Sequence, residues 1–107
     1  MKEKNISAKV KLEAFVAQPP TKKCQQVIDA MEEVVRRHPE QARLVVCGRG
    51  APWPEPPSAV LQLLVHKGAC VPVCLVDGVL VAAGQVPSVE DLEARLLRAL
   101  GQHRAGK

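Results

Sequence analysis

The segment Gly68–Gly78, GACVPVCLVDG, places a proline directly before a short apolar run that ends in Asp-Gly. The run Val73–Val76 is rich in β-branched residues, which favour strands. The Asp-Gly pair tolerates positive φ, so it strongly favours a two-residue hairpin turn. We therefore predict that Pro72 leads into an antiparallel pair of strands, Val73–Val76 and Val79–Ala82.

The rest of the chain predicts two more strands and three helices around this hairpin. Apolar and charged residues alternate near the N-terminal end, which is typical of a half-buried strand. Three other segments repeat their apolar residues every three or four positions, as amphipathic helices do. Strands are expected over 10–16 and 42–47, and helices over 21–38, 58–66 and 88–100. In the order β-α-β-α-β-β-α, a helical crossover makes the first two strands parallel, and the hairpin makes the last two antiparallel.

Length and composition predict one folded domain. The chain has 107 residues, of which 47% are hydrophobic, and this is enough for a single core. The domain is expected to span 1–107, with its core over 10–100 and tails over 1–9 and 101–107. Phe15 and Trp53 are the only aromatic residues, which disfavours single-stranded nucleic-acid binding by stacking. The net charge of +4 is too mild to indicate DNA as a partner.

The sequence predicts a cytoplasmic protein without membrane insertion. The N-terminal segment MKEKNISAKVK contains no apolar stretch of the kind that signal peptides carry. No apolar run approaches the roughly 18 residues that are needed to cross a membrane. In the cytoplasm, the four cysteines are more often reduced, metal-binding or catalytic than paired in structural disulfides.

The element order, together with a proline immediately before the third strand, resembles the thioredoxin fold. In that superfamily the proline is cis and faces the start of the first helix, and Pro72 occupies this place. A trans bond is the default for X-Pro, so a cis Val71-Pro72 bond is implied only by the resemblance. The resemblance covers roughly 10–100 and implies an α/β domain with a four-stranded mixed sheet and three helices.

The C-terminal third is more particularly similar to the ArsD-type arsenic chaperones. The run VPVCLVDGVLVAAGQVPSVEDLEARL carries the similarity through its Leu-Val-Asp-Gly, Gly84 and Pro87. Such proteins pass trivalent arsenic or antimony to an efflux ATPase, and some repress transcription weakly. That family carries an adjacent Cys-Cys pair where this chain has Gln18-Pro19, and a third cysteine that matches Cys24. Thioredoxins carry Cys-x-x-Cys where this chain has Thr-Lys-Lys-Cys.

Cys24 is the first candidate for chemistry. If Thr21 is the helix N-cap, Cys24 lies in the first turn, where backbone N–H groups and the helix dipole favour a thiolate. Lys22 and Lys23 would favour it too, and together these groups predict a lowered pKa for an accessible Cys24 thiol. The alternative is that Cys24 simply heads the apolar stripe of this helix as a small buried residue.

The other cysteines suggest a soft-ligand site. Cys47 ends the second strand and Cys70 precedes the third, so both are expected at the same edge of the sheet as Cys24. Thiolates there would suit Cu(I), and by chemical analogy As(III) or Sb(III). Because the first strand lies between the second and third, Cys47 and Cys70 could be too far apart to share a ligand. Cys70 would then be the natural partner of Cys24, and Cys74, inside an apolar run, is expected in the core.

The loop GRGAPWPEPP, residues 48–57, adds two candidate residues. Trp53 stands between prolines, either as a cap folded over the sheet edge or as an exposed contact for a partner. Arg49 could help to hold an anion or a thiolate at this edge. A protein partner would therefore meet the edge formed by Thr21, Pro72 and Trp53.

Three functions remain open from the sequence. The first is a non-enzymatic protein that binds a soft metal or metalloid through Cys24 with Cys70 or Cys47, beside Pro72, Lys22 and Lys23. The second is a monothiol redox protein with Cys24 as nucleophile. The third is a partner-binding or regulatory domain without a working thiol, which includes a homodimer. Without a Cys-x-x-Cys or another catalytic constellation, enzymatic activity has no support from the sequence.

Overall fold

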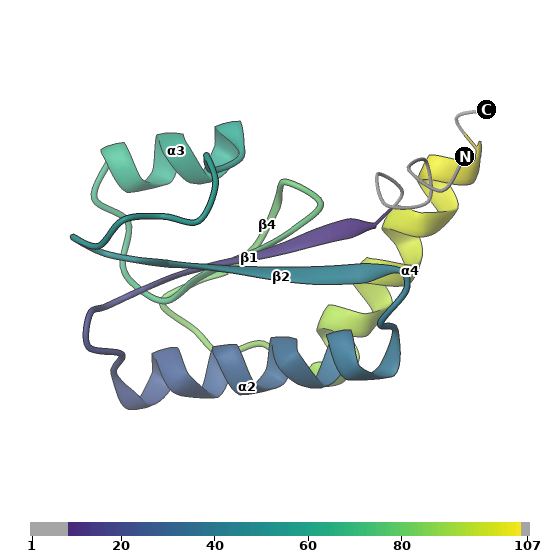
Figure 1. Ribbon diagram of the computed structural model, residues 1–107, viewed down its shortest axis with the longest axis horizontal. Coiled ribbons are helices and arrows are strands. Elements are labelled where there is room, and N and C mark those ends of the chain that lie inside the picture. Colours follow the sequence, from purple (N-terminus) through teal and green to yellow (C-terminus); the bar gives the residue numbers. More distant parts are fainter. Residues whose placement is uncertain (1–8, 106–107) are drawn as a thin grey trace.

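The computed structural model describes residues 9–105 and shows the predicted order of seven elements (Figure 1). They are β1 (Val10–Val16), α2 (Lys22–Arg37), β2 (Ala42–Gly48), α3 (Ala59–His66), β3 (Val73–Val76), β4 (Val79–Ala83) and α4 (Val89–Ala105). Across this part of the chain, every helix is too short or too polar to reach from one side of a membrane to the other.

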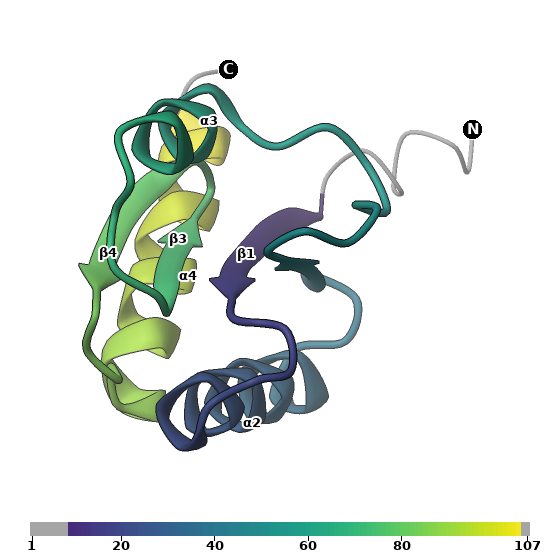
Figure 2. The same cartoon turned by 90° about the vertical axis from the view of Figure 1, so that its left-hand side faces the viewer.

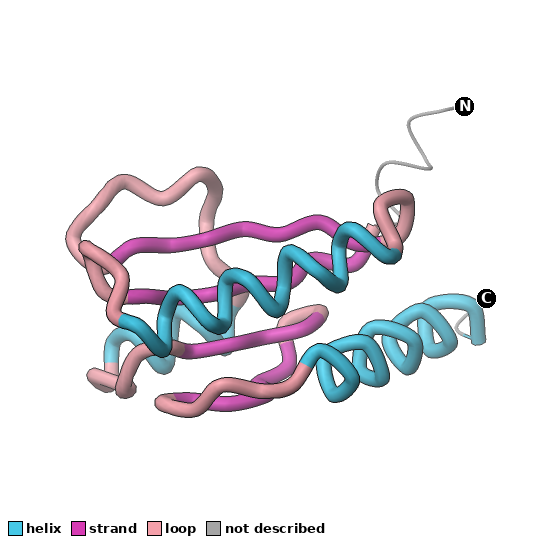
Figure 3. Tube along the Cα trace, turned by 90° about the horizontal axis from the view of Figure 1, so that it is seen from below, coloured by secondary structure: helices cyan, strands magenta, loops and turns pink. Residues whose placement is uncertain are grey.

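The four strands form one mixed sheet in the order β2-β1-β3-β4. β1 runs parallel to β2 and antiparallel to β3, and β3 is antiparallel to β4. The helices α2 and α4 lie on one face of this sheet, and α3 lies on the other (Figures 1 and 2). Seen from the side of α2 and α4, the two helices lie next to each other across the strands (Figure 3). This is the α/β architecture that the sequence predicts.

Two apolar clusters, one on each face of the sheet, form the core. The α2–α4 cluster contains buried residues from β1, β3 and both helices, among them Leu12, Met31, Leu92 and Leu96. The α3 cluster is smaller and includes Phe15, Val45, Leu61, Val73 and Leu75. Because helices cover both faces, the central strands are buried on both sides, which α/β sheets commonly show.

The burial of β1 corrects one expectation. The alternating pattern of this strand predicts a half-buried strand with charged residues in solvent, yet every residue from Leu12 to Val16 is buried. Glu13, one of the charged residues, has no exposed surface. The α3 segment and the loop before it cover the face on which Glu13 lies, and the local pattern carries no information about that cover.

The turns and helix starts agree closely with the sequence. Asp77 and Gly78 have φ of 55° and 77°, as the hairpin requires. Gly68 follows α3 with a φ of 78°, as expected for a left-handed helix end. The Val71-Pro72 bond is cis, as the resemblance implied, and Gln18-Pro19 is a second cis bond that the sequence did not predict.

The C-terminal helix is longer than predicted. The sequence placed a tail over 101–107, but α4 continues through Gly101 to Ala105. Glycine inside a helix costs only about 1 kcal/mol relative to alanine, so Gly101 need not end it. The predicted N-terminal tail falls almost wholly on residues 1–8, which lie outside the described residues, as do 106 and 107.

Candidate functional site

The candidate site begins at the first turn of α2. Thr21 has extended backbone angles and its hydroxyl oxygen accepts a hydrogen bond of 3.1 Å from the N–H of Cys24. Thr21 is therefore the N-cap, and Cys24 is the third residue of the helix, as predicted. The preceding prolines, Pro19 and Pro20, keep the chain from β1 out of helical geometry until this cap is reached.

The Cys24 sulfur is polarised but covered. The N–H of Ala17 points to Cys24 Sγ at 3.4 Å. Burial raises the pKa of the Cys24 thiol. Several effects lower this pKa: hydrogen bonds from the Thr21 side chain and from the backbone of Ala17 and Thr21, and the charge of Arg49. Together these outweigh burial, so that the pKa lies below its ordinary value. The side chain nevertheless has 0% exposure. Both expectations for Cys24, a favoured thiolate and a buried core residue, therefore describe the same side chain.

The source of positive charge near Cys24 differs from the expectation. The sequence named Lys22 and Lys23, whereas the cation that contributes to the lowered pKa of Cys24 is Arg49 in the loop after β2. Both lysines are exposed, and Lys23 Nζ reaches away to the carbonyl oxygen of Gly84 at 3.4 Å. The sequence suggested that Arg49 could help to hold a thiolate, and the charge of Arg49 acts on the pKa of Cys24 in that direction.

Pro72 lies at the same end of the sheet. Phe15 pairs with Val73, so the residues just beyond β1 and just before β3 are neighbours. Pro72 is buried, and its carbonyl oxygen accepts a hydrogen bond of 2.7 Å from the N–H of Gly84. Since Lys23 binds the carbonyl of the same Gly84, the first turn of α2 is linked to the Pro72 loop through the end of β4.

The four cysteines are free thiols and fall into three environments. Cys24 and Cys74 belong to the α2–α4 cluster, and burial, followed by the charge of Cys24, raises the pKa of Cys74 to about 12. Cys47 lies in the α3 cluster on the opposite face, where burial and then the charge of Glu13 raise its pKa. Cys70 is exposed. Cys74 is thus a core residue, as predicted.

This layout separates the residues of the three-thiol hypothesis. Cys24 and Cys47 are on opposite faces of the sheet, because Cys47 pairs with Phe15 and shares its side. Cys70 lies beside Gly84, where an added Cβ would stand 3.5 Å from Cys70 Cβ. Among the side chains that the structure describes, those of residues 9–101, no three of His, Cys, Asp or Glu come close enough together to hold a metal ion.

Trp53 caps the α3 face. Its indole N–H donates a hydrogen bond of 2.9 Å to the carbonyl oxygen of Gly48, and its ring meets Phe15 edge-on at 5.6 Å between centroids. Arg49 places its guanidinium 5.5 Å from the centre of the Phe15 ring. Trp53 is half-buried, and these contacts favour the structural cap among the two roles that the sequence left open.

Glu13 is a chemically notable residue that sequence reasoning missed. Its Oε2 accepts a hydrogen bond of 2.9 Å from the N–H of Ser58, at the start of α3, and lies 3.5 Å from Lys11 Nζ. Its Oε1 is buried and has no hydrogen-bond partner in the described part of the chain. Nearby, Glu55 accepts hydrogen bonds from Arg43 and Lys11. These two hydrogen bonds, of which the one from Arg43 has the larger effect, lower the pKa of Glu55 to about 2. The only sequence signal for the burial of Glu13 was Phe15, which lies two residues further along β1 and therefore on the same face of the sheet.

Comparison with known proteins supports the fold. No protein-family model matches the chain, and no curated protein matches it. A solved structure of thioredoxin-2, titled as a component of the malaria parasite protein secretion machinery, is similar with a TM-score of 0.58 and 15% identity over 84% of this chain and 82% of that one. At this identity the likeness shows the fold alone: the chain has a thioredoxin-like fold. The resemblance to the ArsD-type proteins stays a prediction.

Proposed function

We propose that this protein is a non-enzymatic binding protein that holds a soft, thiophilic species at the edge where α2 begins, with Cys24 as the first ligand. The observation that carries the proposal is the Cys24 thiol, which sits at a helix N-terminus, accepts the Ala17 N–H and has a lowered pKa. The thiolate is the form of cysteine that binds metals. Soft acceptors such as Cu(I), and by analogy As(III) and Sb(III), suit it.

The second ligand in this proposal is Cys70. It is exposed and adjoins Gly84, whose carbonyl binds Lys23 in the first turn of α2. Cys47 is disfavoured because it lies on the other face of the sheet. Cys74 shares a cluster with Cys24, but with a pKa of about 12 its sulfur is protonated near neutral pH and is therefore a poor ligand.

Binding requires a local opening. Cys24 has no exposed surface, so a ligand reaches it only when its cover moves. In an opening-limited process, the observed binding rate rises with ligand concentration and then levels off at the rate of opening. We expect this behaviour for arsenite. The same opening would present Thr21 and Pro72 to a protein that receives the ligand, as an ArsD-type delivery role in the cytoplasm would need.

The test is alkylation of each cysteine, read by mass spectrometry, with and without arsenite. We expect arsenite to protect Cys24 and Cys70 together and to leave the labelling of Cys47 unchanged. Cys24→Ser should abolish protection of Cys70, and Cys47→Ser, the matched control, should not. Protection of Cys70 that survives in Cys24→Ser, or no protection at all, would contradict the proposal.

A monothiol redox role is a second candidate, because a lowered cysteine pKa also increases the fraction of thiolate, which is the nucleophilic form. In that role the Cys24 thiolate attacks a disulfide sulfur of a glutathione-linked substrate, forming a mixed disulfide and expelling a thiolate. The two candidates differ in one readout. Turnover of mixed disulfides with excess glutathione that is lost in Cys24→Ser favours redox chemistry, whereas arsenite protection without turnover favours binding.

A partner-binding domain without a working thiol is the third candidate, and the edge strand β4 favours it. Val79 and Leu80 in this strand are 59% and 39% exposed, and an uncovered apolar edge can pair with another chain, including a second copy. If Cys24→Ser and Cys70→Ser leave every measured behaviour unchanged while Val79→Lys alters the oligomeric state seen by light scattering, this candidate replaces the first.

A further inference from the structure

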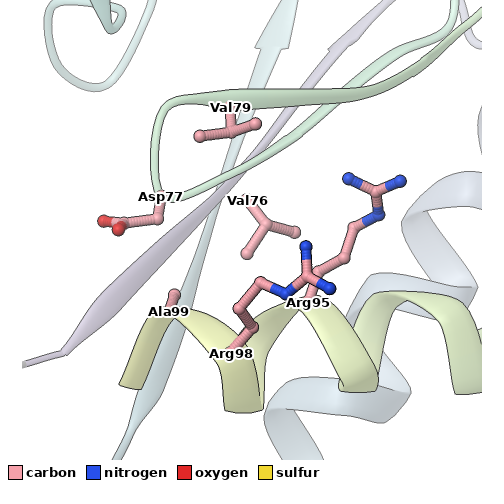
Figure 4. A pocket seen from close by; sticks show the side chains of 6 residues that line it. All are labelled: Val76, Asp77, Val79, Arg95, Arg98 and Ala99. Carbon is pink, nitrogen blue, oxygen red and sulfur yellow. The ribbon is translucent and has the colours of Figure 1, made fainter. Parts of the chain in front are cut away.

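A pocket of about 160 Å³ lies between the β3–β4 hairpin and the middle of α4 (Figure 4). It adjoins the turn of the hairpin, and Pro72 precedes the other end of β3. The hairpin contributes two valines and Asp77, and α4 contributes two arginines and an alanine. The lining residues are Val76, Asp77, Val79, Arg95, Arg98 and Ala99. At roughly 30 Å³ for each water molecule of the liquid, the pocket has room for about five waters or a small organic molecule.

Within the described side chains, the two arginines have no strong acidic partner, unlike three other arginines. Arg36, Arg37 and Arg43 each hydrogen-bond a glutamate. Arg95 Nε, in contrast, is 4.0 Å from Asp91 Oδ1, and it is buried with no hydrogen-bond partner among the described residues. Arg98 likewise makes no hydrogen bond or ion pair with the residues whose side chains the structure describes, 9–101. Two guanidinium groups therefore line one pocket with their donors largely unused.

Helix geometry brings these groups to the same side. Residues three apart in an α-helix are neighbours on its surface, and both side chains extend from α4 toward the hairpin, whereas the Asp77 carboxylate points away from them (Figure 4). Between the charges and the sheet lie apolar side chains, of which Val76 and Ala99 are buried and Val79 is 59% exposed. The pocket thus combines a cationic wall with an apolar wall.

We propose that this pocket binds a small organic oxyanion, either a phosphate monoester or a carboxylate. Its charged group would be held by Arg95 and Arg98, and its short hydrocarbon part would lie against Val76 and Val79. Planar guanidinium groups bind both kinds of oxyanion through paired hydrogen bonds. An anion would also relieve the repulsion between two neighbouring cations. The site is independent of the thiol site, so a ligand here needs none of the cysteines.

The test is an NMR titration of the full chain with inorganic phosphate, ethyl phosphate and propionate. We expect saturable shifts of the backbone amides at 76–79 and 95–99 with ethyl phosphate or propionate, and the tighter of the two identifies the oxyanion. Ethyl phosphate should bind more tightly than inorganic phosphate if the valines take part. Because the Arg98 side chain is exposed, the Arg98→Gln variant should fold normally. We expect this variant to bind about tenfold more weakly, which is the usual effect of losing a charge-assisted hydrogen bond.

Arg36→Gln is the matched control, because it removes the same charge from an exposed position on another helix. It should leave the affinity unchanged, whereas Arg95→Gln should weaken it as Arg98→Gln does. Shifts that grow linearly without saturation, or equal weakening by Arg36→Gln, would attribute the effect to net charge and overturn the proposal. Saturable shifts centred on the first turn of α2 would overturn it as well.

Discussion

At the scale of the residue, Cys24 shows how a helix start can favour the thiolate form of a side chain that is fully buried. Burial by itself favours the neutral thiol, as it does at Cys74, whose pKa rises to about 12. At Cys24 the hydrogen bonds of Thr21 and Ala17 and the charge of Arg49 outweigh burial and lower the pKa. The two buried thiols of one cluster therefore differ because hydrogen-bond donors and a cation act on Cys24, whereas burial dominates at Cys74.

We predict that Thr21→Val raises the pKa of Cys24, because it removes the hydroxyl and leaves the fold of the cap otherwise similar in shape. The Cβ carbon shift of Cys24, followed by NMR against pH, measures this pKa without requiring access to the sulfur. In the wild type the midpoint should lie below the ordinary value of 9.0. Lys22→Gln is the control, and a midpoint that moves as far in this variant as in Thr21→Val would contradict the assignment.

The lowered pKa of Cys24 also fixes the sign of its effect on stability. A group whose pKa is lower in the folded protein stabilises it above the unfolded pKa, and this contribution is lost as the pH falls through the folded pKa. The free energy of unfolding of the wild type relative to Cys24→Ser should therefore increase with pH up to about the ordinary value of 9.0. Urea unfolding at a series of pH values measures it, and a difference that shrinks toward alkaline pH would contradict the lowered pKa.

At the scale of the element, α2 and α3 begin differently although both have a hydroxyl residue at the N-cap. Thr21 caps α2 with its side chain, whereas Ser58 makes no side-chain cap hydrogen bond and its Oγ is buried without a partner among the described residues. The N–H of Ser58 binds Glu13 instead. The carboxylate of a neighbouring strand thus occupies the N-terminal end of α3, where the helix dipole favours an anion.

We expect opposite results from the same substitution at these two caps. Thr21→Ala should lower the free energy of unfolding by about 1 kcal/mol, the usual cost of losing an N-cap. Ser58→Ala should be neutral or stabilising, because it removes a buried hydroxyl that makes no hydrogen bond. Urea unfolding of both variants decides this, and a Ser58→Ala variant that is as unstable as Thr21→Ala would show that the Ser58 hydroxyl has a stabilising contact.

Glu13 gives a prediction for strand β1. We expect Glu13→Ala to lower the free energy of unfolding by about 3 kcal/mol, since it removes a fully buried side chain that accepts a hydrogen bond and pairs with the partly buried Lys11. Glu13→Gln should cost only about 1–2 kcal/mol, because the amide oxygen can still accept the Ser58 N–H. Equal losses in the two variants, measured by urea unfolding, would show that the charge and not the hydrogen bond matters.

At the scale of the whole molecule, Glu93 joins the two helices of one layer. It accepts a hydrogen bond of 2.7 Å from His38 Nε2 and one of 3.3 Å from Arg37, so α4 is tied to the end of α2. Hydrogen bonding to His38, and then the charge and hydrogen bond of Arg37, lower the pKa of Glu93 despite desolvation, which raises it. This polar link supplements the apolar contacts between α2 and α4.

We predict that this link makes the stability depend on pH. A carboxylate with a lowered pKa stabilises the fold above its unfolded pKa, and that contribution is lost as the pH falls through the folded pKa. Wild type should therefore be more stable than Glu93→Gln above the ordinary value of 4.5, and the difference should vanish in more acidic solution. Thermal unfolding against pH tests this, with Glu40→Gln as the control on an exposed side chain.

The sequence predicted the fold better than it predicted the site. Element order, the hairpin and the three helix starts follow from local signals, and the cis bond before Val73 followed from a resemblance. Which face of the sheet each cysteine occupies depends on strand register and on where α3 packs, and neither is local. Thus the sequence grouped Cys47 with Cys24, whereas Cys47 lies beside Phe15 and under α3.

The exposure of Cys70 has a practical consequence. The other three cysteines are buried, so a maleimide dye or a nitroxide should attach first at Cys70 in a brief reaction, before the local opening exposes Cys24, and no cysteine has to be mutated. That attachment point adjoins Gly84 and the loop of Pro72. Because the label occupies the thiol proposed as the second ligand, its emission or spectral line shape would report a protein partner that docks at this edge rather than a bound metalloid, while the arginine pocket at the far end of the hairpin stays unlabelled.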